Sequence, residues 1–163
     1  MQYLITPEEL KSNGFLNQNI DDQYITTALE EAQDIYLREI IGDNLYNKLL
    51  NHTSTEPNIY DELINNHVKY FLKYKIASLL CMVVNFKIRN AGVITQYSQD
   101  ITPTTMEDTK SVMNYFNGQA DFYANRLTKF LIQKKKNIPE YRCSCSEITS
   151  PNEKHPVCSI YLG

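Results

Sequence analysis

Residues 63–84 read LINNHVKYFLKYKIASLLCMVV and carry the longest helical pattern of the chain. Their apolar side chains recur every three or four positions, the spacing of one helix face. We expect this face to bury Leu63, Ile64, Val68, Phe71, Leu72, Ile76, Leu79, Leu80, Val83 and Val84. Nearly every side is apolar between residues 77 and 84. A helix from Ile59 to about Asn90, ended by Gly92, should therefore form the centre of the core.

Two further long helices are predicted on either side of this stretch. The first runs from about Asp21 to Ile41, where Gly42 stops it, and we expect it to bury Ile25, Ala28, Leu29, Ala32, Ile35, Tyr36 and Ile40. The other begins at Thr104 or Thr105, after a loop that starts at Val93. Its expected buried face is Met113, Phe116, Ala120, Tyr123, Leu127, Phe130 and Leu131, with Lys134, Lys135 and Lys136 in its final turn.

Two short helices complete the prediction. Thr6 followed by Pro7, Glu8 and Glu9 has the form of a capping box that begins a helix, and Asp43 can cap a second one. The fold class is therefore all-α, a small bundle of three long and two short helices. We place an α-helical domain at residues 1–138 and an extended, irregular C-terminal arm at residues 139–163.

Composition and charge limit the class of protein. With 163 residues and 42% apolar side chains, the chain suits one folded domain, and we find neither a membrane span nor a secretory signal. Residues 1–66 carry a net charge of −9 and residues 67–142 a net charge of +7. Such halves can pair within one bundle or between neighbouring subunits.

The C-terminal arm contains four potential metal ligands, Cys143, Cys145, His155 and Cys158. Thiolates and imidazoles in close pairs can hold zinc, but one residue between paired cysteines is less usual than two. We expect free thiols and no cofactor, with a structural zinc site and disulfides as the alternatives. Cys81 lies in the apolar helix and is expected to be a buried core cysteine.

Nothing in the sequence predicts an enzyme. His52 in a predicted loop and His67 on the polar side of a helix are interpreted as surface residues. Consecutive acidic residues diverge on a helix and form no acid/base pair. The five glycines form no phosphate-binding loop. We therefore predict no catalytic and no cofactor-binding residues.

Some residues are candidates for interaction instead. We expect the acidic helix to meet a neighbouring molecule through Glu30, Glu31 and Asp34. Lys134, Lys135 and Lys136, with Arg142, suit the carboxyl end of a helix and could also contact phosphate. Ile160, Tyr161 and Leu162 would reach outward on the arm.

The order of these parts resembles a family of viral proteins. It combines LITPEEL at residues 4–10 and IIGDNLYNKLL at residues 40–50 with a long apolar helix, a polar loop and a further long helix. This resembles the head–tail connector (neck adaptor, or head-completion ring) proteins of tailed bacteriophages, most closely those of crAss-like and other Bacteroidetes phages.

The resemblance implies a structural virion protein, made in the host cytoplasm and located in the neck at the head–tail interface. It would form a homo-oligomeric ring, usually a dodecamer, between the portal protein and other neck or tail proteins. Such a ring extends the channel for genomic DNA, without sequence recognition, and gives the tail a platform. The alternative is a small helical regulatory or nucleic-acid-binding module with a zinc-ordered tail.

Overall fold

The computed structural model describes residues 2–12, 15–53, 58–89, 92–95 and 106–141. In chain order its elements are α1 (Pro7–Ser12), α2 (Asp22–Glu31), the π-helix η1 (Ala32–Leu37), α3 (Arg38–Ile41), α4 (Asp43–Leu50), α5 (Ile59–Leu63), the π-helix η2 (Ile64–Val68), α6 (Lys69–Asn85), β1 (Phe86–Arg89), β2 (Gly92–Thr95) and α7 (Met106–Gln133). Several of these follow one another without a break, so they combine into fewer helical rods.

Three long rods and two short helices result, which confirms the predicted all-α bundle. The α2, η1 and α3 segments form one rod, and α5, η2 and α6 form a second. The third is α7, with 28 residues. Asp21 caps α2 by accepting a hydrogen bond from the backbone N–H of Gln23, and Gly42 ends α3 at a φ of +78°, as the sequence predicted.

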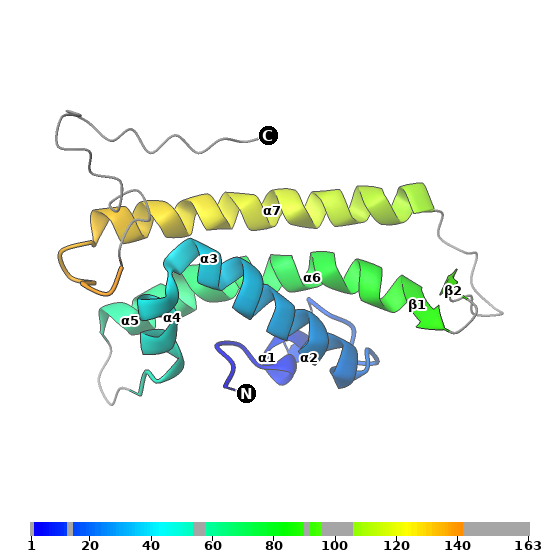
Figure 1. Cartoon of the computed structure of the whole chain (residues 1–163), viewed down its shortest axis with the longest axis horizontal. Helices are drawn as coiled ribbons and strands as arrows, with labels where there is room; N and C mark the ends of the chain where they lie inside the picture. Colours follow the sequence, from blue (N-terminus) through cyan, green and yellow to red (C-terminus); the bar gives the residue numbers. More distant parts are fainter. Residues whose placement is uncertain (1, 13–14, 54–57, 90–91, 96–105, 142–163) are drawn as a thin grey trace.

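The rods pack in layers around α6 (Figure 1). Helix α7 lies along one side of α6 and runs in the opposite direction, while α2 and η1 pack against α6 as well. The fully buried large side chains come from all three rods and from both short helices: Leu10, Ile25, Leu29, Leu37, Ile41, Leu45, Leu49, Leu63, Leu72, Ile76, Leu127 and Leu131. Helix α6 is thus central, as expected.

The π-helix η1 changes which residues of the first rod are buried. The sequence period predicted that Ile35 would face the core, but 57% of its surface is exposed. Gln33 and Leu37 are fully buried instead. A π-helical turn contains more residues than an α-helical turn, so it rotates the following side chains about the helix axis. The prediction for Ile35 is therefore wrong, and its side chain lies on the surface.

The second rod ends earlier than predicted. Helix α6 stops at Asn85, and the next residues form an antiparallel hairpin in which Phe86 pairs with Thr95 and Arg89 with Gly92. Ile88, Val93 and Ile94 are β-branched, which favours strands over a helix. A helix reaching Asn90 and a loop starting at Val93 are therefore both wrong.

The apolar end of α6 is only partly buried. Met82 is 46% exposed and Val84 is 39% exposed, whereas Ala77 and Leu80 lie in the core. The expectation that Val84 is buried is wrong, because the last turn of α6 extends past α2, which packs against an earlier part of the helix (Figure 1).

The chain beyond α7 remains part of the packed body. Lys134, Lys135 and Lys136 lie in a turn after α7 rather than in its final helical turn. Ile138 and Tyr141 are buried in the core, and Glu140 accepts a hydrogen bond of 2.8 Å from the hydroxyl of Tyr60. The described body thus reaches Tyr141, three residues beyond the predicted boundary at 138. No helix of the described residues is long and apolar enough to cross a membrane.

Candidate interaction site

A groove lies where η2 faces the second half of α7. It has a volume of about 560 Å³ and is lined by His67, Phe122, Asn125, Arg126, Lys129, Phe130 and Gln133. We call it the α7 groove. Six of its seven residues come from α7 at helical spacing, so a single face of this helix forms most of the wall.

His67 forms the opposite wall and is not the surface residue that the sequence predicted. It is 8% exposed, and its ring centroid lies 4.2 Å from that of Phe130, with 31° between the ring planes. Its Nδ1 atom is buried and has no hydrogen-bond partner in the described structure. Burial lowers the pKa of His67, the nearby Arg126 lowers it further, and Glu62 opposes them. The imidazole therefore adds a neutral, flat surface to the groove at neutral pH.

The groove carries two cations. Arg126 and Lys129 line it and both are exposed. Neither forms a salt bridge with a carboxylate of the described residues. An arginine and a lysine near the aromatic rings of Phe122 and Phe130 suit an anionic group joined to an apolar one.

Aromatic side chains continue from the groove along α7. We call Phe15, Tyr70, Tyr74, Tyr115, Phe116, Phe122 and Tyr123 the aromatic row. Tyr123 stacks on Tyr74 at 5.2 Å between centroids and on Tyr70 at 5.4 Å, while Phe122 meets Tyr123 edge-on. Tyr115 and Phe122 are each 61% exposed. The inner rings therefore hold the outer ones in place while the outer ones remain open to a partner.

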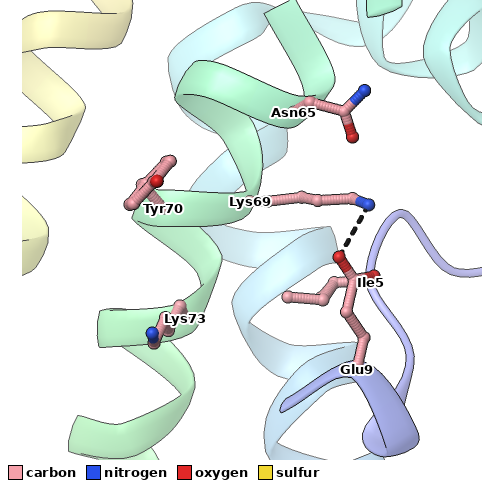
Figure 2. A pocket seen from close by; sticks show the side chains of 6 residues that line it. All are labelled: Ile5, Glu9, Asn65, Lys69, Tyr70 and Lys73. Atoms are coloured by element: carbon pink, nitrogen blue, oxygen red, sulfur yellow. Dashed lines mark hydrogen bonds and ion pairs between the residues drawn. The ribbon is translucent and has the colours of Figure 1, made fainter. Parts of the chain in front are cut away.

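A second hollow of about 380 Å³ lies on the other side of Tyr70 and is lined by Ile5, Glu9, Asn65, Lys69, Tyr70 and Lys73 (Figure 2). Its main contact is internal, since Lys69 forms a 2.8 Å ion pair with Glu9 and so joins α6 to α1. The Lys73 ammonium lies 4.3 Å from the centroid of Phe15. The side chains that line this hollow therefore mainly hold α1 and α6 together, and the hollow is a poorer candidate for a binding site than the α7 groove.

The acidic residues predicted to meet a neighbour are engaged within the subunit. Glu30 accepts a 2.8 Å hydrogen bond from the Tyr3 hydroxyl, which raises the pKa of that tyrosine. Asp34 accepts one from the Tyr46 hydroxyl. Glu31 is half-buried and lies near Lys75. The acidic residue of this rod that is exposed and without an ion pair in the described structure is Glu39, one turn after Ile35. Neither Ile35 nor Glu39 was among the surface residues that the sequence pattern predicted.

The other predicted site residues divide into two groups. Lys134, Lys135 and Lys136 are exposed beside the end of α7. Outside the described residues lie Arg142, Cys143, Cys145, His155, Cys158, Ile160, Tyr161 and Leu162. Within the described ranges, no group of three or more His, Cys, Asp or Glu side chains could hold a metal ion.

Two single residues differ from their predicted settings. The side chain of His52 is only 9% exposed, because its Nε2 atom lies 3.0 Å from Asp61 at the start of α5. Cys81 is half-buried rather than fully buried. Its thiol donates to the carbonyl oxygen of Ala77 at 3.2 Å, and burial raises its pKa.

Comparison with known proteins places most of the chain in one group. Residues 37–150 match a family of unknown function (DUF6712), and this range exceeds half of the chain. The chain belongs to that family. The matched range includes every residue that lines the α7 groove, whereas α1 and α2 precede it. No curated protein and no solved structure matches the chain.

Proposed function

We propose that this chain is a structural subunit that assembles with copies of itself into a ring in the neck of a tailed bacteriophage. There it would connect the portal to the tail and extend the DNA channel, as in the head–tail connectors that the sequence resembles. The observation that carries the proposal is the exposed apolar surface on α7 and α6, made by Tyr70, Val112, Tyr115 and Phe122. Large exposed apolar surfaces on soluble domains mark places of contact with other molecules.

The composition of this surface favours another protein as the partner. Tyrosine, phenylalanine and arginine are enriched in the centres of protein interfaces. The outer rings of the aromatic row are held by ring contacts with Tyr123 and Phe116, so little side-chain freedom is lost on contact. Helix α7 also packs mainly on α6, and no other described element covers its opposite face along much of its length (Figure 1).

A ring requires contacts between two different surfaces of the subunit. The exposed surface of α7 carries cations at Arg126 and Lys129, and the rod on the other side of α6 carries five acidic residues, of which Glu39 is exposed without an ion pair in the described structure. Two unlike surfaces of opposite charge support head-to-tail assembly over a symmetric dimer.

A second candidate function is binding to nucleic acid. Five cations gather near the carboxyl end of α7: Arg126, Lys129, Lys134, Lys135 and Lys136. Such a group can neutralise backbone phosphates without reading sequence. A monomer that binds a DNA fragment, and loses it as salt is raised, would favour this candidate over the ring.

The test of the ring is the mass of the full chain by light scattering over a range of concentrations, alone and with the portal complex of the parent virion. We expect an assembly of many copies, and we expect the double variant Tyr115→Glu/Phe122→Glu to be a monomer. Ile132→Glu is the matched control, since Ile132 is exposed on another face of α7. A wild-type monomer that ignores the portal would contradict the proposal.

A further inference from the structure

We infer that the α7 groove of one subunit receives Ile35 and Glu39 from the α2–η1–α3 rod of a second copy of this chain. The inference rests on the proposed function, because it names the two surfaces through which the subunits would meet. It assigns an occupant to the groove and a role to the outward rotation of Ile35, which the folding of a single subunit does not explain.

Ile35 has the features of an inserted side chain. It is a large aliphatic residue, 57% exposed, in the middle of a rod whose other apolar residues mostly face the core. The π-helix η1 turns it outward, and π-helical turns occur often at functional sites. Glu39 lies four residues further along the same rod and is exposed, so the two side chains share one face.

The α7 groove offers the complementary features. Phe122, Phe130 and the neutral ring of His67 give it apolar walls, and Arg126 and Lys129 add two cations that form no ion pair in the described structure. An apolar side chain with a carboxylate one turn away matches an apolar groove with adjacent cations. The volume of about 560 Å³ is in the range that holds several side chains rather than one.

The two surfaces cannot meet within one subunit. Leu127 and Leu131 of α7 are fully buried, so the neighbouring Arg126 and Lys129, which are exposed, face away from the core. Ile35 is exposed on a different rod. Where two subunits do not also exchange the reciprocal contact, a contact between these unlike surfaces is heterologous. Each pair then keeps one free groove and one free Ile35 surface, so subunits add until a ring closes or an open filament grows.

The experiment uses two full-length variants, each with one surface disabled. Ile35→Asp keeps the groove, and Arg126→Glu/Lys129→Glu keeps the Ile35 surface. We expect each to have the mass of a monomer on its own, by light scattering and sedimentation. Mixed in equal amounts, they should form a dimer of twice that mass and nothing larger, since only one intact pair of surfaces remains.

Controls match the size and charge of these changes. Ile132→Asp places an acid on another exposed isoleucine, and Lys134→Glu/Lys135→Glu reverses two cations just beyond α7. Both controls should assemble like the wild type. Circular dichroism should show wild-type helicity in all four variants, because every substituted residue is exposed.

Each outcome is decisive. If both single-surface variants assemble to the same mass as the wild type, the inference is wrong while the ring proposal stands. The same conclusion follows if a control variant loses assembly as completely as a single-surface variant does. If only the groove variant is a monomer, another segment or another protein occupies the groove, and the inference is again wrong. If the variants pair as expected but electron microscopy of the wild type shows open filaments, the contact stands and the closed neck ring fails. A wild type that stays a monomer at every concentration would overturn both.

Discussion

Gln33 is a fully buried polar residue whose hydrogen bonds fix the start of the chain. Its Oε1 atom accepts the backbone N–H of Leu4 at 3.0 Å, and its Nε2 atom donates to the carbonyl of Gln2 at 3.1 Å and to the Tyr46 hydroxyl at 3.2 Å. One side chain therefore ties the N-terminal segment to η1 and α4. A sequence pattern gives no sign of this, because glutamine is usually a surface residue.

Replacing Gln33 by methionine should destabilise the protein. Methionine has a similar size but leaves the N–H of Leu4 and the carbonyl of Gln2 without partners, at a cost of about 2–3 kcal/mol. The measurement is urea unfolding followed by circular dichroism. Gln33→Glu serves as the comparison, because it retains an acceptor for Leu4 but loses both donors. An unchanged midpoint in Gln33→Met would show that this network contributes nothing to stability.

His67 makes the stability of the protein depend on pH. Burial lowers its pKa below the usual 6.5, with Arg126 of α7 adding to the effect and Glu62 of α5 opposing it. The unfolded state therefore binds this proton at a higher pH than the folded state, so acid favours unfolding. At pH values well above 6.5, His67 is neutral in both the folded and the unfolded state, and the protein has its full stability. As the pH falls below 6.5, the unfolded state takes up the proton first, and the free energy of unfolding decreases.

The variant His67→Phe separates this effect from packing. It retains a ring against Phe130 and removes the unpartnered Nδ1 atom, so we expect near wild-type stability at about pH 8 and a gain of about 1 kcal/mol over the wild type at about pH 5. Urea unfolding at both values measures the difference. Equal pH dependence in the two proteins would mean that other groups cause the acid sensitivity.

At the scale of elements, Gly42 and Gly118 form a natural pair for comparison. A Cβ atom added at either position would meet nothing within 4 Å, so only the backbone distinguishes them. Gly42 joins α3 to α4 at φ +78° and ψ 158°, a region almost restricted to glycine. Gly118 lies inside α7, where glycine is a poor helix former.

Alanine should therefore have opposite effects at the two positions. We expect Gly42→Ala to lower the free energy of unfolding by about 1–3 kcal/mol. Gly118→Ala should raise it by about 0.5–1 kcal/mol. Thermal unfolding of both variants beside the wild type measures the signs. Loss of stability in Gly118→Ala would indicate that this exposed part of α7 needs the small residue for a contact with another molecule.

The π-helix η1 explains which predictions of buried residues in the first rod were correct. Ile25, Ala28 and Leu29 are buried as the α-helical period requires, because they precede η1. Within η1 the period changes, and Ile35 turns outward. The sequence contains no signal for an extra residue in a turn, since no proline or glycine marks residues 32–37.

For the whole molecule, the acidic first half and the basic second half are partly paired internally. Lys69 of α6 forms an ion pair with Glu9 of α1. Lys75 lies near Glu31, and its ammonium group makes a cation–π contact with Tyr36, 3.7 Å from the ring centroid. Burial lowers the pKa of Lys75, and Asp121 and Glu31 oppose this. Glu39, Arg126 and Lys129 are among the charges that form no ion pair in the described part of the chain, and they are the ones assigned to contact between subunits.

Salt should therefore weaken assembly more than it weakens the fold. At about 1 M salt the screening length falls to about 3 Å, so exposed charges attract one another little, whereas buried apolar contacts persist. We expect sedimentation to show dissociation toward monomers at high salt, with helicity unchanged. An assembly state that does not respond to salt would contradict a role for charge pairing between subunits.

The sequence by itself determined where the helices lie and most of their ends. Capping by Thr6 and Asp21, the stop at Gly42 and the apolar period of the central rod all act within one or two turns, so they can be interpreted locally. Only the tertiary structure decided which surfaces remain open. His67 is buried because it meets Phe130 from a distant part of the chain, and Ile35 is exposed because η1 rotates it away from α6. Packing between rods depends on residues far apart in sequence, and local periodicity carries no information about it.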